Sequence, residues 1–174
     1  MNFNLQPTLE SDLLHLRPLI WGDFDPLYRV AKDPLIWEQH PANNRHEKNA
    51  FEKFFNDAIN SGGALVAIDS KSRNIIGSSR YHGYNPDKSE IEIGWTFLAR
   101  FYWGGVYNYE MKRLMLEHAF NFVKSVIFVV GIENIRSQRA VLKIGGNRVG
   151  TGKDDGDNES FIYQILKSDY VNKK

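Results

Sequence analysis

The stretch Phe101-Tyr102-Trp103-Gly104-Gly105-Val106-Tyr107-Asn108 decides how this chain folds. It closes a strand-like run and leads at once into a strongly amphipathic segment, so it predicts a turn from a strand into a helix. The first N–H groups of a helix have no partner within the helix, and the helix dipole adds partial positive charge there. Two adjacent glycines let a ligand approach the backbone closely. The stretch therefore predicts an anion site, for which pyrophosphate is a natural occupant.

The glycine pair alone is equally compatible with a plain tight turn. No Gly-Lys-Ser or Gly-Lys-Thr follows it, so the stretch is not a Walker loop, and it does not match the dinucleotide-binding fingerprint. The functional interpretation of this stretch therefore depends on its neighbours.

A second polar segment, Glu133-Asn134-Ile135-Arg136-Ser137-Gln138-Arg139, begins about thirty residues later. Asn134 is a good N-cap and Ser137 stands at the capping-box position, so both residues can simply begin a helix. Alternatively, the Asn134 amide and the Ser137 hydroxyl face a cofactor thioester. Arg139 would then approach phosphate, which suits a bidentate guanidinium.

The third candidate is Glu92, which lies in an alternating run over residues 90–97. Glu90, Glu92, Gly94 and Thr96 share one face of this predicted strand. A partly buried Glu92 has a raised pKa and can accept a proton, whereas the alternative for both glutamates is a solvated strand face. Gly94 indicates a bulge, which would direct a backbone N–H towards a ligand.

The remaining elements extend on both sides of these segments. Apolar alternation and runs predict strands over residues 13–19, 64–68, 75–81, 90–97, 126–132 and 159–166, and helical periodicity predicts helices over residues 22–32, 47–60, 107–122 and 134–144. Residues 34–46 have no clear period and are expected to form a loop or a broken helix. Because no linker or repeat separates these elements, residues 1–174 are expected to form a single α+β domain.

The composition fits a soluble globular protein, with 42% hydrophobic and 25% charged residues among 174. The formal net charge of +1 gives no indication of a nucleic-acid or membrane partner. The chain has no cysteine, and its five histidines show no metal-ligand spacing, so we expect no metal. There is no apolar leader and no run of ~20 apolar residues, which favours a cytoplasmic location.

Several aromatic side chains are candidates for a substrate wall. His82 and Tyr84 follow a hairpin strand, and Tyr28, Trp37 and His40 lie in the N-terminal helical region. For each of them, ordinary packing in the core is the competing interpretation.

The motifs together resemble the GNAT superfamily (the GCN5-related N-acetyltransferases), and most closely its RimJ/RimL-like branch, which includes acetyltransferases of ribosomal-protein N-termini. The resemblance covers roughly residues 8–168. It rests on the order and spacing of Leu16-Arg17-Pro18-Leu19, Glu92-Ile93-Gly94-Trp95, Tyr102-Trp103-Gly104-Gly105, Glu133-Asn134-x-x-Ser137 and Leu142-x-x-Gly145.

The resemblance implies a central mixed, mostly antiparallel sheet of about six or seven strands flanked by about four helices. This sheet would split into a V-shaped cleft that holds acetyl-CoA. The pyrophosphate would meet backbone amides of Trp103, Gly104, Gly105, Val106, Tyr107 and Asn108, and the thioester carbonyl would meet the bulged strand near Trp95, Thr96 and Phe97. Asn134, Ser137 and Arg139 would complete the cofactor site.

The activity implied is transfer of an acetyl group to a primary amine, on a protein N-terminus or a small molecule, by direct attack in a ternary complex. Glu92 would be the base, and Ser137, Asn134 or Tyr107 would stabilise the departing thiolate. The acceptor is expected to contact residues 20–45 and 80–90, including Tyr28, Trp37, His82, Tyr84 and Glu90. The sequence leaves open whether the protein is a monomer or a homodimer.

Two positions depart from the family pattern. Phe101 replaces the usual Arg or Gln of the phosphate motif, and Val106 replaces its last small residue. Both departures favour the alternative of a CoA-binding sensor without turnover. A third reading, a nucleotide-phosphate binder, is disfavoured because no magnesium-ligand motif accompanies the loop.

Overall fold

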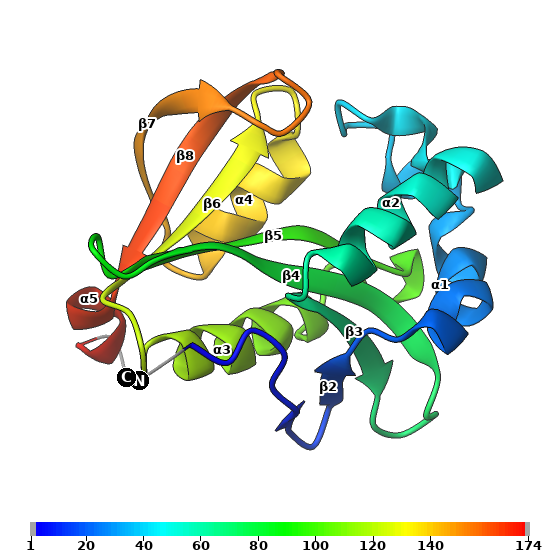
Figure 1. Cartoon of the computed structure of the whole chain (residues 1–174), viewed down its shortest axis with the longest axis horizontal. Coiled ribbons are helices and arrows are strands. Elements are labelled where there is room, and N and C mark those ends of the chain that lie inside the picture. Colours follow the sequence, from blue (N-terminus) through cyan, green and yellow to red (C-terminus); the bar gives the residue numbers. More distant parts are fainter. Residues whose placement is uncertain (1–2, 173–174) are drawn as a thin grey trace.

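In the computed structural model, which describes residues 3–172, one eight-stranded sheet runs through the whole molecule (Figure 1). Its strand order is β1-β2-β3-β4-β5-β6-β8-β7. Among the strands of residues 3–172, only β5 and β6 pair in parallel. The strands are β1 (Leu9–Glu10), β2 (Leu14–Pro18), β3 (Ala64–Asp69), β4 (Ile75–Asn85), β5 (Glu90–Leu98), β6 (Ser125–Gly131), β7 (Asn147–Lys153) and β8 (Glu159–Leu166).

The helices cover both faces of the sheet. Those within residues 3–172 are α1 (Phe24–Ala31), α2 (Lys48–Asn60), α3 (Tyr107–Ala119), α4 (Ile135–Lys143) and α5 (Lys167–Val171), with 3-10 turns η1 (Trp21–Asp23), η2 (Pro34–Ile36), η3 (Asn43–His46) and η4 (Arg100–Tyr102). One core packs α3 and α4 against the sheet, and a second packs α1 and α2 against the opposite face. All six residues of β3 are buried because both cores enclose that strand.

The sheet splits between β5 and β6. The two strands pair only where Glu90–Glu92 meet Ser125–Ile127, and beyond that point they diverge. Figure 1 shows β6, β8 and β7 rising away from β5 and β4. The V-shaped split of the sheet that the resemblance implies is therefore present in the fold.

β5 also contains the expected bulge. Ser78 pairs with Phe97 and Arg80 pairs with Gly94, so three steps along β5 oppose two along β4. Trp95 takes up the extra residue with a φ of 51°, a conformation that is uncommon for a bulky side chain. Gly94 precedes this strained position, which agrees with the prediction made from the glycine.

The sequence missed β1, β7 and α5. β7 has the sequence Asn-Arg-Val-Gly-Thr-Gly-Lys and is largely exposed, because it lies at the edge of the sheet and pairs only with β8. An edge strand with few buried side chains gives no apolar alternation to read. The predicted broken region over residues 34–46 is confirmed as two 3-10 turns joined by loops.

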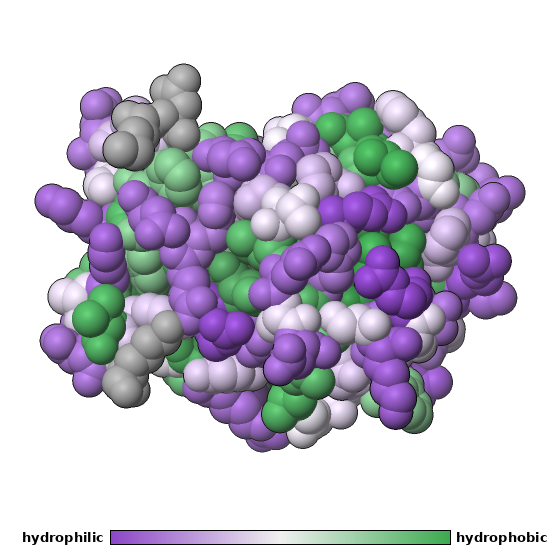
Figure 2. Space-filling view, turned by 90° about the horizontal axis from the view of Figure 1, so that it is seen from below, coloured by the Kyte–Doolittle hydropathy of each residue, from purple (hydrophilic) through white to green (hydrophobic). Residues whose placement is uncertain are grey.

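The described helices are short. Even α2 and α3 have 13 residues each, and within residues 3–172 none combines the length and apolarity needed to cross a bilayer. Viewed from below, the surface mixes hydrophilic and hydrophobic side chains, and polar groups separate its apolar areas (Figure 2).

Candidate active site

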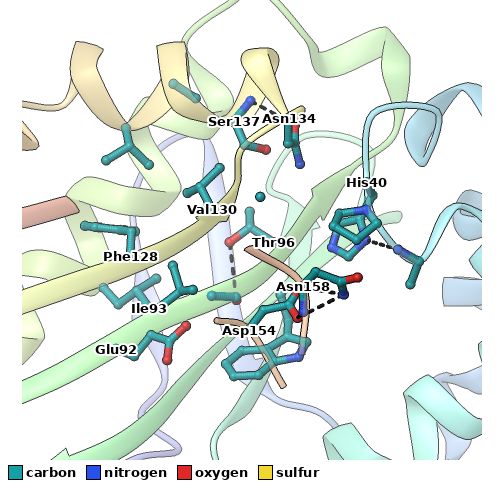
Figure 3. A pocket seen from close by; sticks show the side chains of 18 of the residues that line it. His40, Glu92, Ile93, Thr96, Phe128, Val130, Asn134, Ser137, Asp154 and Asn158 are labelled. Carbon is teal, nitrogen blue, oxygen red and sulfur yellow. Dashed lines mark hydrogen bonds between the residues drawn. The ribbon is translucent and has the colours of Figure 1, made fainter. Parts of the chain in front are cut away.

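A pocket passes through the split of the sheet (Figure 3). Residues of α3 and α4 line it on one side, β5 and β6 form its walls, and the loop that contains His40 lines it together with the turn over residues 153–158. In Figure 3, Glu92 and Ile93 of β5 lie beside Phe128 of β6, while His40 lies across the pocket from Glu92. Elements from both faces of the sheet thus contribute to the lining of the pocket.

Glu92 lies half-buried in this pocket. The pKa of its carboxyl group is raised to about 7, mainly by burial and also by the nearby charge of Asp155, while Arg80 opposes both effects. A Cβ atom on Gly94 would lie 3.0 Å from Glu92 Oε1, so the glycine leaves room for this carboxylate. Near neutral pH, Glu92 is consequently able both to accept and to release a proton.

Lys112 of α3 lies on the other side of β5, beneath the bulge. It is buried, it lines the pocket, and it donates hydrogen bonds to the hydroxyls of Ser79 and Thr96. Its Nζ lies 5.6 Å from the centroid of the Phe128 ring on β6, so it occupies the base of the split. Burial lowers the pKa of Lys112 to about 7.

The start of α4 is compatible with both roles predicted from its sequence, a helix cap and a contact with the cofactor. Asn134 Oδ1 accepts a hydrogen bond of 3.2 Å from the Ser137 N–H, so Asn134 is the N-cap of α4. Both residues also line the pocket, as Figure 3 shows. Arg139 is exposed on α4 and does not line the pocket.

The glycine loop leads into the pocket at Asn108. Val106 precedes α3 without any side-chain cap, so the first N–H groups of that helix keep no side-chain acceptor. Gly104 has a φ of 72°, and a Cβ atom on Gly104 or Gly105 would meet no atom within 4 Å. The loop therefore presents free backbone donors on an open surface.

Several predicted cofactor residues use their side chains elsewhere. Trp103 Nε1 donates to the Leu98 carbonyl at 2.9 Å, and the Tyr107 hydroxyl donates to Asp69 Oδ1 at 2.9 Å. Phe97 packs in the core beneath α1 and α2, whereas Trp95 and Thr96 line the pocket. Any contact that Trp103 or Tyr107 makes with a ligand phosphate would therefore involve the backbone.

Of the five predicted acceptor residues, only Trp37 lines the pocket. The Tyr28 hydroxyl donates to the His46 carbonyl, Tyr84 packs on Phe3, and Glu90 accepts hydrogen bonds from Ser125 and Gln164. His82 lies against the Trp95 ring, 5.1 Å between centroids, without reaching the pocket. His40, considered together with Trp37 in the sequence, does line it.

Sequence reasoning missed three cationic residues at or near the pocket: Arg45, Arg80 and Lys112. Lys112 had a readable signal, because it shares a helical row with Leu116 and Ala119, which are both buried. Arg45 lies in a segment without periodicity, and Arg80 stands among polar strand residues, so neither gave a signal.

Comparison with known proteins identifies a family with this architecture. Residues 14–147 match a family model described as the acetyltransferase (GNAT) domain. No curated protein sequence matches the chain.

Three solved structures resemble it at low sequence identity. A GCN5-related N-acetyltransferase from Brucella melitensis has a TM-score of 0.80 and 19% identity, over 95% of this chain and 81% of that one. A protein from Vibrio cholerae described as a putative ribosomal-protein-serine acetyltransferase has a TM-score of 0.75 and 13% identity, over 92% and 97%. A spermidine N-acetyltransferase from the same organism, in complex with CoA and spermine, has a TM-score of 0.68 and 19% identity, over 93% and 100%.

These likenesses support the fold, and the family match spans most of the residues that build the pocket. The split sheet, the bulged β5 and the uncapped start of α3 lie within or next to the matched region. The chain belongs to the GNAT acetyltransferase family.

Proposed function

We propose that this protein is an acetyl-CoA-dependent N-acetyltransferase that moves an acetyl group to a primary amine by direct attack in a ternary complex. The observation that carries the proposal is the position of Glu92, a carboxylate of raised pKa in a pocket that passes through the split of the sheet. An acceptor amine on one face of the sheet and an acyl donor on the other face would meet in this pocket, beside a base.

The residues present fit acetyl-CoA. The uncapped N-terminus of α3 supplies backbone N–H groups and partial positive charge for a pyrophosphate, and the open space around Gly104 and Gly105 admits one. Asn134 and Ser137 offer polar groups to a pantetheine arm in the pocket. Acetyl-CoA would supply the activated acetyl thioester.

The chain's own residues then have separate tasks. Glu92 removes a proton from the acceptor ammonium, either directly or through water, because only the neutral amine is a nucleophile. The ammonium of Lys112 adds positive charge at the base of the split, where it favours developing negative charge. Since the chain has no cysteine, an acetyl-cysteine intermediate is excluded.

The alternative of a CoA-binding sensor depends on Phe101 and Val106. Their side chains are 91% and 57% exposed, and neither lines the pocket, so they leave the cleft open. We therefore favour an active enzyme over a CoA-binding sensor.

Membership of the RimJ/RimL-like branch agrees with the likeness to the first Vibrio cholerae protein described above. A cytoplasmic location and the oligomeric state stay predictions.

Replacement of Glu92 by Gln tests the proposal. Glu92→Gln should lower kcat by about 10²–10⁴-fold, the usual contribution of general base catalysis, and leave the affinity for CoA nearly unchanged. Because Glu92 must be ionised while Lys112 must keep its proton, and the pKa of each group is about 7, kcat/KM of the wild type should pass through a maximum near pH 7. The measurement is a pH profile of thiol release with acetyl-CoA and a panel of amines.

Glu52→Gln, on the exposed side of α2, is the matched control and should behave as wild type. Ligand binding is measured first by thermal shift, where a ligand at ~100 times its Kd adds about 2.7 kcal/mol to stability. Failure of both CoA and acetyl-CoA to shift the melting temperature would contradict the proposal, and an unchanged profile in Glu92→Gln would remove Glu92 as the base.

A further inference from the structure

Two arginine side chains beside the pocket have no carboxylate partner. Arg45 lines the pocket, with its Cζ 4.7 Å from the centroid of the Phe54 ring. Arg80 of β4 lies behind Trp95, with its Cζ 5.8 Å from the Phe54 centroid and 4.6 Å from that of Trp95. Across residues 3–172, neither guanidinium forms an ion pair, and Nε and Nη2 of Arg80 are buried without a hydrogen bond.

His40 satisfies Arg45 only in part. Burial lowers the pKa of this imidazole to about 4, so the ring is neutral and has one acceptor nitrogen. Two donors compete for it, because the Ala42 N–H lies 2.9 Å from Nδ1 and Nη1 of Arg45 lies 3.2 Å from Nε2. At most one of the five N–H groups of Arg45 is thus paired with His40.

This arrangement of the two arginines destabilises the folded state unless a bound anion pairs with them. Partly dehydrated guanidiniums close to one another raise the free energy of the folded state when no anion pairs with them. Burial and the charge of Arg80 lower the pKa of Arg45, while Asp154, Asp57 and Asp155 raise it from beyond ion-pair distance. Glu92 lies across the pocket from His40, which is beside Arg45, and Asp155 shifts the pKa of both Glu92 and Arg45.

We infer that the acetyl acceptor is a primary amine that also carries an anionic group, such as an amino acid, with the anionic group paired to Arg45 and the amine facing Glu92. Arg80 adds positive charge behind the aromatic rings and attracts the same group. This inference rests on the proposed function and specifies its substrate class. A polycation such as spermidine would bring positive charge against Arg45 and is disfavoured.

The test compares matched amines with the full-length protein. Each of a panel of amino acids is paired with its amide, which keeps the amine and removes the negative charge, and spermidine is added as the polycation. At least one amino acid should have a kcat/KM roughly ten- to a hundredfold above that of its amide, as expected for a hydrogen bond to a charged group. In the presence of CoA, the same amino acid should raise the melting temperature more than its amide does.

Arg45→Met should abolish this preference while leaving the thermal shift by CoA alone unchanged. Lys53→Met, an equal charge change on the exposed side of α2, should retain the preference. Peptides with an acidic second residue form a further arm. A preference for them over free amino acids would assign the anionic group to a peptide side chain instead of a free carboxylate.

Two results would overturn the inference without touching the proposed function. One is acetylation of amides or spermidine at least as fast as that of every amino acid and acidic peptide. The other is a CoA-loaded protein that no amino acid or acidic peptide stabilises more than its uncharged counterpart. Failure of the proposed function has a separate sign, which is absence of any thermal shift by CoA and acetyl-CoA in the wild type.

Discussion

At the scale of single residues, the buried ammonium of Lys112 opposes the stability of the fold. Its pKa falls from 10.5 to about 7, so between these values the unfolded chain binds one proton more than the folded chain. Stability from this group therefore rises with pH across that window and is lowest below about 7. We expect Lys112→Met to be more stable than the wild type by roughly 1–4 kcal/mol below pH 7, with a difference that shrinks towards pH 10.5. Thermal melting over this pH range measures it.

Lys124→Met, at an exposed position after α3, is the control and should show no such dependence. If Lys112→Met were less stable at every pH, the hydrogen bonds to Ser79 and Thr96 would outweigh the desolvation of the ammonium, and Lys112 would be a structural donor. A stabilised variant with impaired turnover would instead indicate that the chain keeps a destabilising charge for its activity.

At the scale of elements, the start of α4 allows its structural and functional roles to be separated. Asn134→Ala removes the N-cap and should cost about 1 kcal/mol of stability. Asn134→Ser keeps a good cap and removes the amide that faces the pocket. If the amide contacts the cofactor, Asn134→Ser should melt like the wild type and bind CoA several-fold more weakly. Calorimetric titration with CoA, together with thermal melting of both variants, gives the answer, and wild-type affinity in Asn134→Ser would reduce Asn134 to a cap.

The elements also show what the sequence can and cannot predict. Strands β3 to β6, β8 and the helices α2 to α4 follow from apolar periodicity, because burial imposes that pattern on them. The bulge followed from Gly94, and the cap of α4 from Asn134. Arg45 and Arg80 could not be placed, because the pairing of β4 with β5 and the path of η3 bring them together across long stretches of chain. Tertiary contacts of this kind leave no local pattern.

At the scale of the whole molecule, the two parts of the sheet pair directly only where β5 meets β6, and side chains outside the sheet add further connections. Arg136 of α4 provides one. Its N–H donates to Gln39 Oε1 at 3.0 Å, and its Nη2 donates to the Ile36 carbonyl at 2.7 Å. Its Cζ lies 4.0 Å from the centroid of the Trp103 ring. One side chain thus connects α4, the loop that lines the acceptor side of the pocket, and the loop before α3.

Arg136→Met should therefore loosen both loops while the cores stay intact. We expect faster amide hydrogen exchange over residues 34–46 and 100–106, and a KM for acetyl-CoA that rises several-fold while kcat changes less, because the loss falls on binding and not on Glu92. Lys143→Met, at the exposed end of α4, is the control and should leave exchange unchanged. Unchanged exchange in both segments of Arg136→Met would show that the β5–β6 pairing and the packed cores hold the two parts together without this arginine.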